Sequence, residues 1–174
     1  MKILETERLF LRHFELSDIE YLYLLYSDPE VRRYFPEGTL TYAETKAEVE
    51  YYLKGHPNYP ELGLWATIQK KTDQFIGRCG LLPWTIDGQD EVEVAYLLGK
   101  AFWGQGLGTE AAQGIRDHAF EDLGLSRLVC MIDEGNLASI QVAKKIGMSF
   151  EKESQDELGS FHLYAINRFE WKIA

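Results

Sequence analysis

Three glycines at alternating positions are the most informative feature of the 174-residue sequence. They lie in the segment Phe102-Trp-Gly-Gln-Gly-Leu-Gly-Thr-Glu-Ala111, between a strand-like run and a helix-like run. The first amides of a helix have no partner within the helix and carry the positive end of its dipole, so they bind anions. Glycine has no Cβ, which lets a phosphate approach the backbone closely. The segment therefore predicts a phosphate-binding turn.

Two common phosphate-binding turns do not fit this segment. A dinucleotide-binding turn has the spacing Gly-x-Gly-x-x-Gly in an early βαβ unit, but Thr109 stands at the third glycine position here. A P-loop ends in Gly-Lys-Ser or Gly-Lys-Thr, and the segment contains no lysine.

The glycine segment resembles the acetyl-CoA-binding turn of the GNAT acyltransferase superfamily. It is most similar to the RimJ/RimL-like branch, which contains the ribosomal-protein N-terminal acetyltransferases. Three more blocks resemble this branch in the same order: 5–12, 28–34 and 136–148. The superfamily signature is Gln/Arg-x-x-Gly-x-Gly/Ala, and Trp103 stands at its first position. Because an aromatic residue is usual there in this branch, we interpret the departure as subfamily identity.

The resemblance implies acetyl-CoA as cosubstrate. We expect its pyrophosphate on the amides from Gly104 to Thr109, and its pantetheine arm along the main chain of 95–98. In the family the sheet splays beside that strand, so that backbone groups are left free for the ligand. The splay is expected between 95–98 and the next strand, 128–132.

Residues of the late helix are also expected at the cosubstrate. Asn136 is expected to reach the pantetheine, and it suits the N-cap of a helix from Leu137 equally well. Ser139 and Lys145 are expected near the phosphates, with a solvated helix-end cation as the alternative for Lys145. The full set of cosubstrate-binding residues is Ala95, Tyr96, Leu97, Leu98, Trp103, Gly104, Gln105, Gly106, Leu107, Gly108, Thr109, Asn136, Ser139 and Lys145.

The chemistry implied by the resemblance is direct attack of an amine on a thioester. The amine must lose a proton, the oxyanion must be stabilised, and the CoA thiolate must gain a proton. A carboxylate beside the thioester is the usual base, and we expect Glu93, two residues before Ala95 on the same side of the strand. Glu91 has the same parity but lies nearer the hairpin. The alternative for Glu93 is an exposed charge at a sheet edge.

The acid that protonates the thiolate is less clear. Many relatives have a tyrosine in the late helix four residues before its closing glycine, and Ala143 stands at that position here. The candidates are Tyr164, Tyr96 and Ser139. We prefer Ser139, which lies in the matched Asn-x-x-Ser block.

Hydrophobic periodicity and turn residues predict the elements that position these side chains. The expected strands are 7–14, 62–69, 75–86, 91–98, 128–132, 148–153 and 161–171. The expected helices are 17–27, a short one from Asp28 to Pro36, 41–54, one that begins after Gly108 and ends at Gly124, and 138–146. Capping boxes are expected at Ser17 with Glu20 and at Thr41 with Glu44.

This order predicts an α/β fold of the α+β type, with one acetyltransferase domain over residues 1–174. We expect a GNAT-like, mixed and mostly antiparallel central sheet, splayed in the middle and flanked by helices. A β-α-β crossover should join 92–98 to 128–132 in parallel.

The charge balance bears on partners. The chain has 28 acidic and 18 basic residues, a formal net charge of −10. Because nucleic-acid binding depends on Lys and Arg neutralising phosphates, we expect no nucleic-acid partner. The acidic excess should instead attract a cationic acceptor and lie on the acceptor side of the molecule.

Other sequence features predict a cytoplasmic enzyme without a metal. No apolar run approaches the roughly 20 residues that span a bilayer, and the N-terminus does not have the pattern of a signal peptide. Cys79 and Cys130 lie in apolar segments, which favours buried thiols in a reducing compartment over a disulfide. The four histidines have no metal-ligand spacing.

We therefore expect an N-acetyltransferase that acts on a primary amine. The acceptor is a protein N-terminus or a small amine such as an aminoglycoside, a polyamine or an amino acid, and a homodimer is common in the branch. The alternative from another class is a catalytically silent acyl-CoA-binding module. We expect the acceptor pocket to be formed by 17–54 and 83–91. The aromatic residues available to line it are Tyr23, Tyr26, Tyr34, Phe35, Trp65, Trp84 and Trp103, although such residues are more often in the core.

Overall fold

Eight strands form one sheet in the computed structural model, which describes residues 1–173. Their order across the sheet is β1-β2-β3-β4-β5-β6-β8-β7. The strands are β1 (Lys2–Glu5), β2 (Leu9–Arg12), β3 (Gly63–Gln69), β4 (Gln74–Ile86), β5 (Gln89–Leu98), β6 (Arg127–Ile132), β7 (Ser149–Asp156) and β8 (Gly159–Asn167). Neighbouring strands are antiparallel except β5 and β6, which are parallel. The predicted mixed sheet and its crossover are confirmed.

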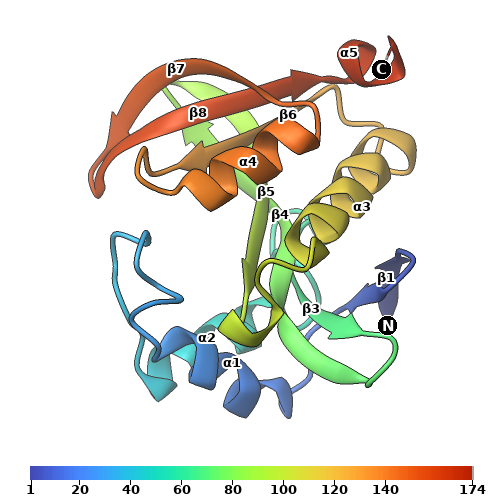
Figure 1. Ribbon diagram of the computed structural model, residues 1–174, viewed down its shortest axis with the longest axis vertical. Coiled ribbons are helices and arrows are strands. Elements are labelled where there is room, and N and C mark those ends of the chain that lie inside the picture. Colours follow the sequence, from blue (N-terminus) through green and yellow to red (C-terminus); the bar gives the residue numbers. More distant parts are fainter. Residues whose placement is uncertain (174) are drawn as a thin grey trace.

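Helices cover both faces of this sheet (Figure 1). They are α1 (Asp18–Tyr26), α2 (Tyr42–Tyr52), α3 (Leu107–Glu121), α4 (Leu137–Lys145), α5 (Arg168–Ile173) and the 3-10 turn η1 (Lys100–Phe102). Alternate residues of a strand face opposite sides, and β5 shows the division clearly. Val94 and Leu98 pack in the core under α3 and α4, whereas Ala95 and Leu97 pack in the core under α1 and α2.

The parallel strands β5 and β6 part almost as soon as they meet. Among the described residues they pair only at Glu93 and Val129. On its other edge, β5 pairs with β4 along its whole length, from Gln89 to Leu98. The second half of β5 therefore has β4 on one side and no strand on the other. The predicted splay between these strands is confirmed, and Glu93 lies at the point where they separate.

Three local predictions are wrong at the chain ends and in a loop. The expected strand 7–14 is the shorter β2 (Leu9–Arg12), and the sequence does not predict β1 (Lys2–Glu5) before it. Thr6 and Leu9 close the turn between them with a 2.9 Å backbone hydrogen bond. Residues 28–36 form successive turns instead of a short helix. The last strand ends at Asn167, whose amide donates to Glu170 at 2.6 Å and opens α5.

The two predicted capping boxes have different outcomes. Thr41 and Glu44 form one at the start of α2, with the backbone amide of Thr41 donating to the Glu44 carboxylate at 2.7 Å. Ser17 occupies the N-cap of α1, but its side chain makes no cap hydrogen bond within the described chain. The buried Asp18 organises that helix start instead, accepting from Arg12 at 2.7 Å and from the amide of Glu15 at 2.8 Å.

A matched pair of substitutions tests this difference. Thr41→Ala should lower the free energy of unfolding by about 1 kcal/mol, because it removes the partner of a helix amide. Ser17→Ala should leave it unchanged, because no cap bond is lost. Urea unfolding of both variants measures the effect, and equal losses would contradict the assignment.

Candidate functional site

The glycine turn directly follows the end of β5 at which β5 and β6 have parted. Gly104 and Gly106 have the left-handed backbone, with φ of +72° and +76°. Gly106 is the N-cap of α3, and the amide of Glu110 donates to its carbonyl at 3.0 Å. The amides of Leu107, Gly108 and Thr109 precede that first bond, so they have no partner within the helix. The turn therefore presents the arrangement of amides that an anion requires.

Arg8 is a residue at this turn that sequence reasoning missed. Its Nη1 donates to the carbonyl of Gln105 at 2.9 Å, and its Nε donates to Glu110 at 2.6 Å. Its Nη2 lies 3.5 Å from the position that a Cβ on Gly106 would occupy. Arg8 and Glu110 are 102 residues apart in the chain, so no local pattern relates them. The fold thus adds a guanidinium beside the amides.

Trp103 contacts the end of β5. Its indole Nε1 donates to the carbonyl of Leu98 at 2.7 Å, and the side chain is about half exposed. This hydrogen bond gives the aromatic residue at the first signature position a structural role. It also occupies a carbonyl that the sequence reasoning assigned to the pantetheine arm.

Two such contacts reduce the number of β5 backbone groups that are free to bind a ligand. The thiol of Cys130 donates to the carbonyl of Val94 at 3.3 Å, and Trp103 occupies that of Leu98. Alternate residues of a strand direct their backbone groups to the same side. The amide and carbonyl of Tyr96 therefore face the separation, between the two occupied carbonyls. Those of Ala95 and Leu97 face β4.

The start of α4 lies across the separation from Tyr96. The Tyr96 hydroxyl donates to the carbonyl of Ser139 at 3.0 Å, and burial raises the pKa of this tyrosine. The amide of Ser139 donates to the Asn136 side chain at 3.2 Å, so the N-cap interpretation of Asn136 is confirmed. Lys145 is exposed in the last turn of α4, and Tyr164 is buried in β8. The structure thus brings Tyr96 and Ser139 together.

Glu93 is a half-buried carboxylate at the point of separation. Trp84 donates to its Oε2 at 2.8 Å, and the Met131 amide on β6 approaches its Oε1 at 3.5 Å. Burial raises the pKa of Glu93, while the bond from Trp84 opposes that rise. The alternative of an exposed edge charge is therefore wrong. Glu91, by contrast, forms an ion pair with Arg127 at 3.0 Å.

The aromatic residues proposed for an acceptor pocket divide between core and surface. Trp65 is fully buried in the core under α3, so that candidate is wrong. Tyr26, the last residue of α1, is fully buried on the face of the sheet that α1 and α2 cover. Tyr34, in the loop between α1 and α2, lies within 3.5 Å of the position that a Cβ on Gly135 would take, after β6. The loop between α1 and α2 therefore reaches the segment after β6, across the separation from β5.

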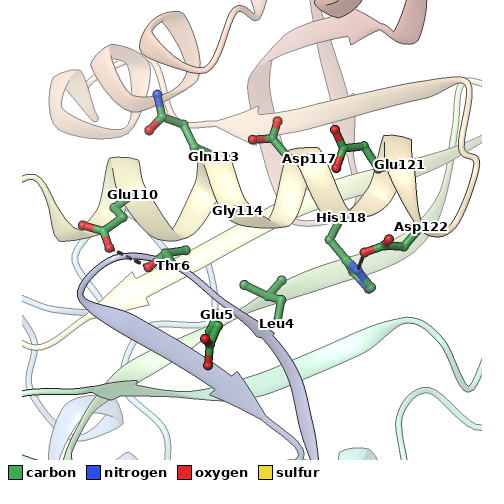
Figure 2. A pocket seen from close by; sticks show the side chains of 10 residues that line it. All are labelled: Leu4, Glu5, Thr6, Glu110, Gln113, Gly114, Asp117, His118, Glu121 and Asp122. Carbon is green, nitrogen blue, oxygen red and sulfur yellow. Dashed lines mark hydrogen bonds and ion pairs between the residues drawn. The ribbon is translucent and has the colours of Figure 1, made fainter.

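A depression with a volume of about 390 Å³ lies between α3 and β1 (Figure 2). Its acidic lining residues are Glu5, Glu110, Asp117, Glu121 and Asp122. Glu110 binds Thr6 and Arg8, and Asp122 lies 2.6 Å from His118. Three acidic side chains of α3 and its C-cap Asp122 therefore line this depression, while 17–54, with eight acidic and four basic residues, is also acidic.

Further features of the described chain bear on metals, membranes and thiols. Within residues 1–173, no group of three or more His, Cys, Asp or Glu side chains is placed to hold a metal ion. No helix in the same range is long and apolar enough to cross a bilayer. Cys79 and Cys130 are buried free thiols, as predicted.

Comparison with known proteins finds a family model and relatives that match most of this chain. A family model described as an acetyltransferase (GNAT) domain matches residues 8–149. The chain is 35% identical over 150 residues to the uncharacterized protein YkkB of Bacillus subtilis, covering 86% of each chain. It is 33% identical over 154 residues to the uncharacterized N-acetyltransferase p20 of Bacillus licheniformis, covering 88% of this chain and 84% of that protein.

Solved structures have the same fold. A GNAT-family acetyltransferase from Bacillus anthracis superimposes with a TM-score of 0.82 at 25% identity, over 97% of this chain and 99% of that one. RimL, a ribosomal L7/L12 alpha-N-protein acetyltransferase in complex with coenzyme A, has a TM-score of 0.76 at 17% identity, over 96% and 98%. The likeness to RimL shows the fold alone.

The hydrogen bond between Trp84 and Glu93 can be tested by titration. Trp84→Phe should raise the pKa of Glu93, because the lost N–H stabilises the ionised carboxylate. Carbon NMR of the labelled carboxyl group measures this pKa. Trp103→Phe is the matched control: its indole is similarly exposed but donates to Leu98, so the pKa of Glu93 should not change. An unchanged or lower pKa in Trp84→Phe would contradict the geometry.

Proposed function

The chain belongs to the GNAT acetyltransferase family, and on that premise we propose that it transfers the acetyl group of acetyl-CoA to a primary amine with Glu93 as general base. It is an acyl-CoA-dependent N-acyltransferase by its family and fold. The observation that carries the assignment of the base is the position of Glu93. It is a half-buried carboxylate where β5 and β6 part, with a raised pKa.

The residues at the separated strands fit acetyl-CoA as cosubstrate. The amides from Gly104 to Thr109, with Arg8 beside them, suit a pyrophosphate. The free amide and carbonyl of Tyr96 suit the pantetheine arm, which would pair with β5 as an added strand does. Asn136, Ser139 and Lys145 remain proposed contacts from α4. Of the four main-chain residues 95–98, we propose Tyr96 as the main contact. The backbone groups of Ala95 and Leu97 face β4, and the carbonyl of Leu98 accepts from Trp103.

The proposed reaction forms a C–N bond and breaks the C–S bond of the thioester. Glu93 takes the proton of the attacking amine, directly or through a water molecule. A carboxylate with a raised pKa is a better proton acceptor at neutral pH than an ordinary one. The departing thiolate receives a proton from Ser139, our proposed acid, with the hydroxyl of Tyr96 beside it as the alternative donor.

The acceptor site is proposed between 17–54 and 83–91, on the face to which Glu93 and Trp84 belong. Membership of the branch with ribosomal-protein acetyltransferases, a homodimer and a cytoplasmic location stay predictions. The names of the two relatives reported above give no acceptor. A thiol-release screen of amines tests the proposal against a silent acyl-CoA-binding module, which would bind acetyl-CoA and acetylate none of them.

The base assignment predicts a specific loss of turnover. Glu93→Gln should lower kcat/KM by about a hundredfold or more, because the amine loses its proton acceptor, while the Kd for acetyl-CoA stays the same. The acid limb of the pH–rate profile should also disappear. In the wild type, activity falls as the pH drops through the raised pKa of Glu93 and the carboxylate is protonated.

Glu91→Gln is the matched control for this loss. Glu91 lies on the same strand and face but is paired with Arg127, so turnover should remain within about twofold of wild type. Equal losses in both variants, or an unchanged acid limb in Glu93→Gln, would overturn the assignment.

The phosphate-binding turn predicts a second separation of effects. Gly106→Ala should lose about 1 kcal/mol of stability because alanine is strained at positive φ. It should also weaken CoA binding by about tenfold, because the displaced amides no longer converge on the phosphate. Gly124→Ala is equally strained, with φ of +68°, and lies beyond the other end of α3. It should lose stability alone, as measured by urea unfolding and calorimetry; an unchanged CoA affinity in Gly106→Ala would contradict the turn's role.

A further inference from the structure

Arg78 is a buried cation without a carboxylate partner. It lies on β4 with 5% of its surface exposed, and its Nε donates to the hydroxyl of Tyr26 at 2.8 Å. That hydroxyl in turn donates to Glu48 on α2. Within residues 1–173, no carboxylate lies at ion-pair distance from Arg78, and its two Nη atoms have no acceptor although solvent reaches them. A buried charge without a partner is costly, so a partner from outside the chain is expected.

A second buried arginine lies at the same place. Arg32, in the loop after α1, is 4% exposed and stacks on Phe35, with 4.2 Å from its guanidinium carbon to the ring centroid. Arg78 lies 5.4 Å from the centroid of the same ring. The Nε of Arg32 donates to the carbonyl of Gly38 at 2.7 Å, and its Nη2 is 3.4 Å from Glu37. Two like charges thus share one aromatic ring.

Two carboxylates lie near the two guanidinium groups. Arg78 reaches that of Glu48 only through Tyr26, and Arg32 pairs with that of Glu37 at 3.4 Å. Glu37 is about half exposed, so water screens its charge from Arg32. The Nη groups of Arg78 therefore have no carboxylate in direct contact within residues 1–173. Burial lowers the pKa of Arg32, whereas the burial of Arg78 is outweighed by the nearby Tyr26 and Glu48, which raise its pKa.

This cluster and Glu93 lie on one face of the sheet. Arg78 pairs with Leu97, and Leu82, four residues further along β4, pairs with Glu93. Residues at even spacing on a strand share a face, and this face is covered by α1 and α2. Four residues of strand span about 13 Å, a distance that the long side chains of Arg78 and Glu93 shorten. A small molecule that spans this distance would contact both.

We propose that the acceptor is a small amine that also carries a carboxylate, and that Arg78, assisted by Arg32, binds this carboxylate while the amine lies at Glu93. The inference rests on the proposed function, because it places the acceptor at that site. A guanidinium edge with two free N–H groups matches the two oxygens of a carboxylate. Because Glu48 and Glu37 already lie near the two guanidinium groups, a carboxylate monoanion fits there better than a phosphate dianion. The expectation of a cationic acceptor from the net charge is thereby replaced by a locally basic subsite.

The test compares amino acids with their primary amides. Glycine, β-alanine, γ-aminobutyrate and ε-aminocaproate are each assayed beside the matching amide, with acetyl-CoA saturating. We expect at least one acid to exceed its amide by about tenfold or more in kcat/KM, the effect of hydrogen bonds to a charged group. Arg78→Met should abolish that preference while the amides react as before. Arg33 is exposed in the same loop as Arg32 and serves as the control, so Arg33→Met should keep the preference for the acid.

A second variant distinguishes ligand binding from a structural role. Glu48→Gln keeps an acceptor for Tyr26 but removes the competing negative charge, so it should strengthen the preference for the acids. If Arg78 served the fold alone, Glu48→Gln would leave the preference unchanged and Arg78→Met would lower turnover of acids and amides alike. Either result would overturn the proposal, as would a preference for aminoethyl phosphate over β-alanine.

A binding measurement keeps this test separate from the proposed function. Calorimetry of the CoA-loaded protein with the same acids and amides should show the acid preference, and Arg78→Met should remove it, even if no amine were acetylated. Absence of turnover with that preference intact would refute the acetyl transfer and leave the carboxylate subsite standing. Turnover of acids and amides alike, with equal affinities, would refute the subsite and leave the transferase.

Discussion

The separation of two parallel strands after a single residue pair is the constraint on which the rest of the site depends. Backbone amides and carbonyls inside a protein need partners, and β5 has none from β6 beyond Glu93. The chain satisfies some of these groups itself, through Cys130 at Val94 and Trp103 at Leu98. Tyr96 is left with its backbone groups free between them. The separation thus leaves backbone groups on one side of β5 available to the proposed cosubstrate.

Burial and charge complete the site that this separation begins. Glu93 lies where water is partly excluded, which raises its pKa and suits a proton acceptor. A glycine turn that binds anions through its amides, as proposed, would let a chain with a net charge of −10 bind a polyanionic cosubstrate. Arg8 donates to a carbonyl of that turn, and acidic side chains line the depression beside α3. Under this proposal the local arrangement decides what binds, and the net charge does not.

The sequence predicts those parts of the fold that local pattern determines. The meander of β3, β4 and β5, the glycine turn before α3, and the Thr41 capping box each depend on residues close together in the chain. Errors at the ends of elements arise where a neighbouring residue takes the role that the pattern gave to another. Arg12 and the amide of Glu15 donate to Asp18, so Asp18 and not Ser17 organises the start of α1. The final helix did have a local signal, since Asn167 and Glu170 are spaced as a cap pair. Arg8 and Arg78 gain their roles only from residues far along the chain, so no pattern in the sequence points to them.

Amide hydrogen exchange on addition of CoA tests most directly whether the separated strands hold the cosubstrate. The amide of Leu97, which faces β4, is the internal reference, because its partner is already present without CoA. Our account predicts that CoA slows exchange at Tyr96 strongly and leaves Leu97 almost unchanged, as an added strand on the free edge of β5 requires. Equal exchange at Tyr96 with and without saturating CoA would contradict it.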